Sequence, residues 1–136
     1  MCKLGDIIVV KEFKNEFGEK MKKHSFVVIS DDKDSIEGFN YEFICNMLCS
    51  FHDEKHKERK LKYKENLAIR SSSIKGDSIN SKEGFIKADQ LYYFKKRKIK
   101  YKVIAKMNEE ALNQLLRLII TLNDEGKIRI VISNLT

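Results

Sequence analysis

The chain has 136 residues, a length that fits one domain with its own hydrophobic core. Apolar residues make up 42% of it and aromatic residues 10%, which excludes a disordered or low-complexity protein. Charged residues make up 35%, and the formal net charge of +7 favours a polyanionic partner such as nucleic acid, although a Lys-rich coding background would explain it equally well.

The three cysteines, Cys2, Cys45 and Cys49, indicate a reducing compartment. Their number is odd and two of them lie in one apolar segment, which fits reduced thiols better than a disulfide framework. No Cys-x-x-Cys or His-x-x-His pair accompanies them, so we expect no metal and no other cofactor. The chain shows no signal peptide and no apolar run of transmembrane length. We therefore expect a cytoplasmic protein that does not use a membrane.

Short strands joined by turns account for most of the chain. Apolar runs rich in β-branched residues predict strands at 4–10, 24–30, 41–50, 67–73, 84–94, 100–105 and 127–133. Residues 11–23 are polar and contain one glycine, which predicts either a long loop or a bent hairpin. Residues 52–66 are almost entirely charged and lack Gly and Pro, so they form either an exposed helix or a solvated loop.

One long helix is predicted near the end, over residues 108–124. Asn108 is a good N-cap, Glu109 and Glu110 lie in the first turn, and Gly126 follows the last turn. The apolar residues between them recur at helical spacing and form a wide face, for the core or for a subunit interface. Strands followed by one helix predict a mainly β domain over residues 1–136, a small antiparallel β-barrel with the C-terminal helix packed at one side.

Three segments of the chain, taken in order, resemble the MazF/PemK family of toxin–antitoxin ribonucleases. Gly5-Asp-Ile7 opens the first strand, and Gly18 to Ser30 is similar to the family's Gly-(Ser)-Glu…Arg-Pro-Val-Val-Val-Ile-Ser. Glu83-Gly-Phe-Ile-Lys-Ala-Asp-Gln90 is similar to its Gly-Val-x-x-(Ala/Cys)-Asp-Gln strand. The likeness covers roughly residues 4–122, and residues 52–66 and the strand at 127–133 depart from it as an insertion and an addition.

The resemblance implies an SH3-like, MazF-like barrel that acts as an endoribonuclease toxin. Family members cleave single-stranded RNA (mRNA) without a metal, by attack of a 2′-hydroxyl on the adjacent phosphorus. The resemblance also implies a homodimer and a cognate antitoxin, for which a protein is the family default and an RNA the alternative. A divergent member is expected, because His24-Ser25 stands where the family has Arg-Pro.

Each role in that reaction has a candidate residue here. His24 begins a buried strand, and an imidazole can act as base or acid at neutral pH. Glu19 would orient His24 or act as the base itself. The family's Thr falls on Cys49 or Ser50, either of which would donate to the phosphate. The candidates for binding RNA phosphates are Lys22, Lys23 and Lys87.

Two other functions stay open at this point. Gyrase-poisoning toxins share the barrel and kill by binding a protein, but their action resembles insertion of a Trp-containing C-terminus, and this chain has no Trp. The chain would instead be a nucleic-acid-binding module if the change from Arg to His24 marks lost catalysis. Residues 52–66 are either a solvated face or a clamp on RNA. In a helix, His52 and His56 would share one face, without an evident third metal ligand.

Overall fold

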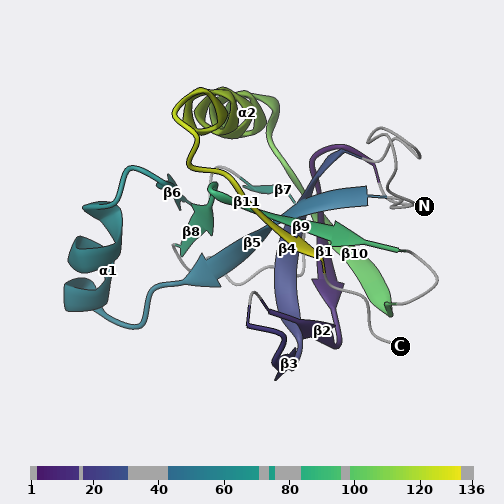
Figure 1. The fold of residues 1–136 in the computed structure, drawn as a ribbon. Coiled ribbons are helices and arrows are strands. Elements are labelled where there is room, and N and C mark those ends of the chain that lie inside the picture. The colour runs from purple at the N-terminus through teal and green to yellow at the C-terminus, as the bar shows by residue number, and fades with distance from the viewer. Residues whose placement is uncertain are drawn as a thin grey trace.

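The computed structural model describes residues 3–15, 17–30, 43–70, 74–75, 84–95 and 99–132, which form one bent sheet and two helices (Figure 1). The elements follow in the order β1 (Asp6–Val10), β2 (Phe13–Lys14), β3 (Lys20–Met21), β4 (His24–Ser30), β5 (Phe43–Ser50), α1 (Glu54–Leu61), β6 (Asn66–Ile69), β7 (Ile74–Lys75), β8 (Gly84–Lys87), β9 (Gln90–Phe94), β10 (Tyr101–Met107), α2 (Glu109–Asp124) and β11 (Arg129–Ile132).

Nine of the strands form one sheet. Its main path is β11-β9-β5-β4-β1-β10-β7, while β8 pairs with both β5 and β6 beside this path. The pairs are antiparallel, except that β11 runs parallel to β9. Within the described residues the sheet is open and does not close into a barrel. The predicted fold class, mainly β with a C-terminal helix at one side, is confirmed.

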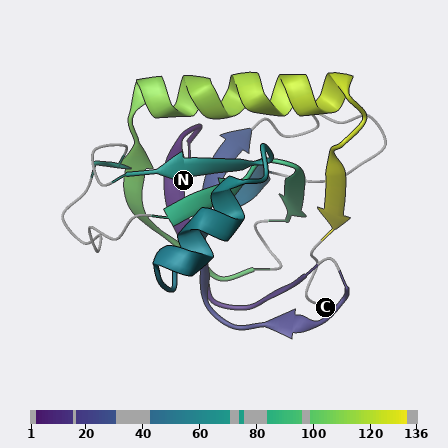
Figure 2. The same cartoon turned by 90° about the vertical axis from the view of Figure 1, so that its left-hand side faces the viewer.

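The segment 11–23, for which a loop and a hairpin were both open, contains a bent hairpin. Its strands β2 and β3 pair with each other and form a separate two-stranded sheet. Of the charged segment 52–66, residues 54–61 form the helix α1. Figures 1 and 2 show α1 beside the end of β5, away from the β2–β3 hairpin.

The central strands are buried on both faces. Ile7 of β1 and Val27 of β4 belong to the hydrophobic cluster that includes α2, whereas Ile8, Val10 and Phe26 belong to a second cluster rich in aromatic rings. Neighbouring residues of one strand point to opposite faces, so both kinds of position must be apolar. This explains why these strands appear in the sequence as continuous apolar runs instead of alternating patterns.

The helix α2 covers one of these two faces. Ala111, Leu115 and Leu122 are buried against the sheet, and Figure 2 shows the helix lying across the strands. Asn108 caps it, since its side-chain oxygen accepts a hydrogen bond from the N–H of Ala111 at 2.7 Å. Among the described residues, no helix combines the length and apolar character needed to cross a membrane.

The predicted strand 84–94 is bent into two. Its first part, β8, pairs with Leu48–Ser50, and its second part, β9, pairs with Phe43–Cys45. Asn46 of β5 lies between the two pairings and is fully buried. Its Nδ2 donates to the carbonyl oxygens of Lys87 at 3.1 Å and Gln90 at 3.0 Å, one on each side of the bend. The Asn46 amide therefore satisfies two carbonyls that the bend takes out of the ladder.

Gly84 allows β8 to lie unusually close to the end of β5. A Cβ built on this residue would stand 2.3 Å from the backbone oxygen of Cys49, a distance that no real contact tolerates. Gly84 also pairs with Ser50 across the ladder. A glycine is thus required where the two strands meet, next to the residues predicted to bind phosphate.

We expect Asn46→Ala to destabilise the protein by about 1–3 kcal/mol, because it removes the amide that donates to the carbonyl oxygens of Lys87 and Gln90. Asn46→Asp is expected to be worse, since a buried carboxylate would then face the same two oxygens. Urea unfolding at neutral pH measures both effects. The control is Asn113→Ala at an exposed position of α2, which removes the same amide without loss of stability. Equal stability of Asn46→Ala and the wild type would show that the amide does not hold the bend.

Candidate functional site

A pocket of about 450 Å³ lies where the start of β4, the end of β5 and α1 meet. Its volume is within the range of about 300–1,000 Å³ that is usual for ligand sites. All three histidines of the chain line it, together with three lysines: His24, His52, His56, Lys23, Lys60 and Lys87. Among its described lining residues none is acidic. The pocket is therefore positively charged and suits an anion.

Five of the residues predicted from the sequence meet in this pocket. Lys23 directly precedes β4 and His24 begins it, while Cys49 and Ser50 come from the end of β5 and Lys87 from the end of β8. The antiparallel pairing of β5 with β4 and β8 brings them together, since Leu48 lies opposite both Ser25 and Ile86.

The other two predicted residues lie outside the lining of this pocket. Glu19 is exposed and belongs to the turn between β2 and β3. Asn15 organises that turn, because its side-chain oxygen accepts hydrogen bonds from the N–H groups of Phe17 and Glu19, both at 2.9 Å. Lys22 lies between β3 and β4 and is exposed.

The helix α1 supplies residues that we did not select as site residues from the sequence. His56 and Lys60 line the pocket from α1, and His52, which precedes the helix, lines it from the same side. The sequence does contain a pattern for this helix face. Asp53 is a good N-cap residue, and His56 and Lys60 after it are four residues apart, so they share one face of the helix. The charged composition favoured a solvated face and concealed this pattern.

His56 is held in one tautomer. Its Nδ1 accepts a hydrogen bond from the backbone N–H of His52 at 3.1 Å, so in the neutral ring the proton lies on Nε2. The side chain of Asp53 accepts from the backbone N–H of His56 at 2.7 Å and caps the helix. Partial burial, followed by the charges of His52, Arg59 and Lys60, lowers the pKa of His56, whereas Asp53 opposes this shift.

His24 lies between the pocket and the aromatic cluster. Its ring is half-buried and forms edge contacts with Phe13 and Phe26, at centroid distances of 6.2 and 6.1 Å. Burial lowers its pKa, a hydrogen bond with the backbone of Leu48 raises it, and the charge of Lys87 lowers it further. The net direction is downward, so His24 is neutral at pH 7. Its Nε2 is buried and has no hydrogen-bond partner.

Cys49 and Ser50 differ in their surroundings. Burial raises the pKa of the Cys49 thiol, although the charges of Lys87 and Lys60 lower it. A thiol in this state is protonated at neutral pH and is not a nucleophile. Ser50, one residue further along β5, is exposed and also lines the pocket. Its hydroxyl is therefore the better donor to a bound anion.

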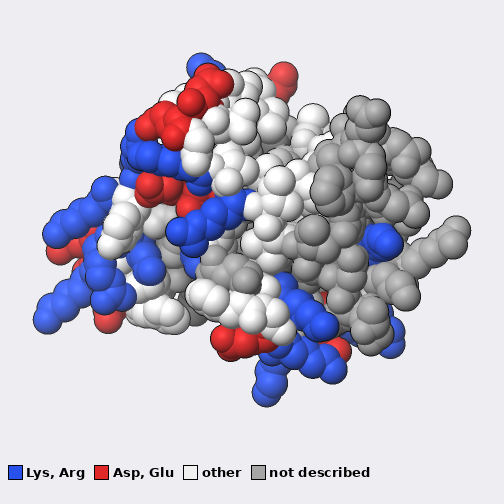
Figure 3. Space-filling model, in the orientation of Figure 1, with Lys and Arg blue, Asp and Glu red and all other residues white. Residues whose placement is uncertain are grey.

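Positive charge continues outside the pocket. Figure 3 shows Lys and Arg side chains gathered over α1 and over the β2–β3 hairpin.

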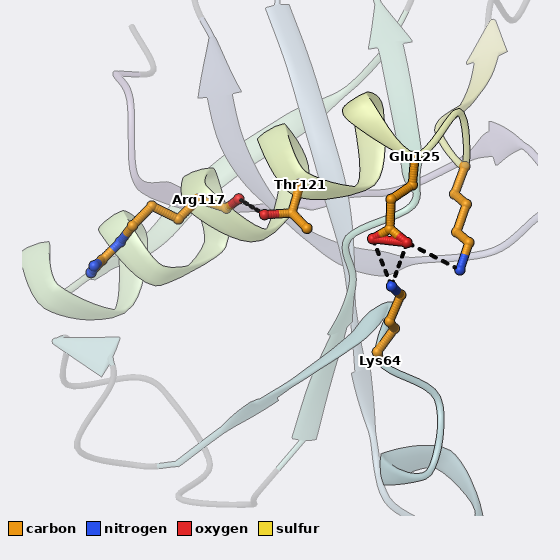
Figure 4. Close-up of polar contacts among 5 residues, drawn as sticks. Lys64, Arg117, Thr121 and Glu125 are labelled. Atoms are coloured by element: carbon orange, nitrogen blue, oxygen red, sulfur yellow. Dashed lines mark hydrogen bonds and ion pairs between the residues drawn. The ribbon is translucent and has the colours of Figure 1, made fainter.

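Beyond α1, Lys64 donates to Glu125 at 2.6 Å, and Lys127 lies 3.5 Å from the same carboxylate (Figure 4). This exposed contact joins the segment after α1 to the end of α2 and raises the pKa of Lys64 through the hydrogen bond to Glu125.

A scan against protein-family models and a search of curated proteins find no match for this chain. The resemblance to the MazF/PemK family therefore rests on its motifs alone. Among the described residues, no group of three or more His, Cys, Asp or Glu side chains is arranged to hold a metal ion.

The lowered pKa of His24 predicts a loss of stability in mild acid. Below its ordinary pKa the imidazole of the unfolded chain takes up a proton that the folded protein resists, so the free energy of unfolding falls as pH falls towards the folded pKa. Urea unfolding at about pH 7.5 and about pH 5.5 measures this loss, which is expected to be smaller in His24→Gln. Lys102→Gln, an exposed change on β10, should keep the wild-type difference. An unchanged pH dependence in His24→Gln would contradict the assignment.

Proposed function

We propose that the chain is a divergent toxin of the MazF/PemK type, which cleaves single-stranded RNA in the cytoplasm without a metal ion. The observation that carries the proposal is the convergence of every histidine of the chain with three lysines in one pocket that has no acidic lining residue among those described. Imidazoles supply proton transfer, and lysines supply the charge that a pentavalent phosphorus intermediate requires.

His24 has the protonation state of a general base. Because Nε2 has no partner, we infer that the ring bonds the Leu48 backbone through its other nitrogen and keeps the lone pair on Nε2. For a ribose 2′-hydroxyl to lose its proton to Nε2, RNA binding must expose this atom, which is buried in the free protein. The 2′-oxygen then attacks phosphorus, the bond to the 5′-oxygen breaks, and a 2′,3′-cyclic phosphate forms.

Neutralisation of the phosphate and protonation of the leaving oxygen are assigned to other groups that line the same pocket. Lys87, whose charge acts on both His24 and Cys49, is placed to neutralise the phosphate oxygens, and the Ser50 hydroxyl donates to them. The exposed imidazole of His52 is the group assigned to protonate the departing 5′-oxygen. The MazF/PemK family has an Arg at the position of His24, and here lysines elsewhere in the pocket supply the positive charge instead. A lysine binds phosphate as a point charge, whereas the guanidinium of Arg binds it as a planar fork.

A toxin of this kind requires an inhibitor. The proposal includes a cognate antitoxin, a protein by analogy with the MazF/PemK type, and a homodimer as the active form. The alternative is a nucleic-acid-binding module without catalysis. The buried position of His24 Nε2 favours it, because a base must reach its proton.

The test is incubation of the purified protein with a long single-stranded RNA in EDTA, followed by mapping of the ends. We expect discrete cuts that leave 2′,3′-cyclic phosphates, and a cleavage rate lowered by about 10²–10⁴-fold in His24→Gln. His24→Ala should abolish both cleavage and growth inhibition in cells.

Lys102→Gln serves as the control, since it removes one positive charge on β10, an element that does not line the pocket. RNA that stays intact but is bound tightly would support the binding module. A fully toxic His24→Ala variant that is shown to be folded would rule out the proposed role of the imidazole.

A further inference from the structure

We propose that α1 supplies a second phosphate-binding subsite, in which His56 donates its Nε2–H to a phosphate oxygen as a neutral imidazole and Lys60 neutralises the same phosphate. The phosphate is the one next to the scissile group, so α1 binds the RNA strand beside the point of cleavage. This inference rests on the proposed function, because it assigns the ligand class of the same pocket. It concerns the segment 52–66, which the resemblance to known toxins does not cover.

The first observation is that the neutral ring of His56 has one nitrogen, Nε2, left to bind a ligand. Its Nδ1 is occupied by the backbone N–H of His52, which leaves Nε2–H as the donor of the neutral ring. Protonation of Nδ1 would break this bond, and the surrounding charges of His52, Arg59 and Lys60 oppose it, with only Asp53 in favour. A neutral donor is therefore what this ring presents to the pocket.

The second observation is that Lys60 lies on the same face of α1 as His56. The two residues are four apart, so their side chains are neighbours, and both line the pocket. Asp53 caps the helix and fixes the start of this face. The backbone oxygen of Lys60 accepts from Asn66 Nδ2 at 2.9 Å, which ties the end of α1 to β6.

The third observation is that two groups of an imidazole and an ammonium reach the pocket from different elements, beside the further lining residues Lys23 and His52. The charge of Lys87 acts on His24, the charge of Lys60 acts on His56, and both charges act on the Cys49 thiol. Each group contains one imidazole and one ammonium. Two such groups, one on the sheet and one on α1, fit two phosphates of one strand better than a single anion.

Ring contacts with Phe85 of β8 help to position α1. The ring of Phe51 stacks on Phe85 with centroids 5.3 Å apart, and the ring of His56 lies 6.1 Å from Phe85. No residue of α1 itself is buried. Substitutions on its pocket face should therefore leave the fold intact and report on ligand binding alone.

The experiment is a binding titration with a fluorescently labelled single-stranded RNA that carries a 2′-O-methyl group on every ribose and cannot be cleaved. We expect His56→Ala to bind about tenfold more weakly, as loss of one hydrogen bond to a charged group implies. His56→Gln keeps an N–H donor at a similar place and should bind nearly as well as the wild type.

Lys60 is tested by salt dependence against a matched lysine of the same helix. Lys60→Gln should reduce the slope of log affinity against log salt by about 0.7, the value for one lost contact to a single strand. Lys55→Gln makes the same change at an exposed position that does not line the pocket, and should leave the slope unchanged. Nitrogen-15 spectra of the histidines should show the proton on Nε2 of His56 both without and with RNA.

The outcomes separate this inference from the proposed function. If the wild type neither binds the methylated RNA nor cleaves unmodified RNA, both are wrong. If the wild type binds but His56→Ala and Lys60→Gln bind equally well, only the α1 subsite is wrong. If His56→Gln binds as weakly as His56→Ala, or the ring becomes doubly protonated in the complex, the neutral donor is wrong.

Discussion

The pairing of β5 with both halves of a bent strand is the constraint on which the pocket depends. Asn46 makes the bend possible, because one buried amide serves a carbonyl on each side of it. The amide oxygen of Asn46 has no partner, so the arrangement keeps a polar atom in an apolar sheet at some expense of stability. In return, β8 stays alongside the end of β5, and Lys87 and Phe85 reach the pocket from it.

His24 links the chemistry of the pocket to the stability of the core. The aromatic rings that pack against it are also the centre of one hydrophobic cluster, in which Phe26 contacts Phe13, Tyr92 and Phe94 edge-on. The packing that buries these rings also removes water from one side of the imidazole and keeps it neutral. A change in this cluster is therefore expected to alter the protonation of His24 as well as the free energy of unfolding.

The parts of the fold that could be predicted are those in which local pattern and tertiary structure agree. The runs at 4–10 and 24–30 have few alternatives to a buried strand, and Asn108 with Gly126 delimits α2 within two residues. The bend in the segment 84–94 could not be predicted, because it depends on Asn46, which is 41 and 44 residues from its partners Lys87 and Gln90. The parallel pairing of β11 likewise follows from tertiary packing, since the sequence pattern of a strand carries no direction.

The candidate site likewise contains residues that could be predicted from the sequence and residues that could not. The strand residues belong to the first kind and those of α1 to the second. His24, Cys49 and Lys87 were selected by their place in motifs on strands, and strand pairing brings such residues together wherever the register is fixed by a core. No residue of α1 is buried, so the spacing of His56 and Lys60 predicts that they share a helix face but not which surface that face lies against. One side of the pocket is thus held by the sheet, and the contacts of the other side include the stack of Phe51 on Phe85 and the hydrogen bond from Asn66 to Lys60. A ligand that bridges the two sides gains contacts to α1 and stabilises its position, because binding shifts a weakly held element towards the bound arrangement. The positive charge of α1 then attracts the phosphates of an RNA strand that approaches the imidazoles of the pocket.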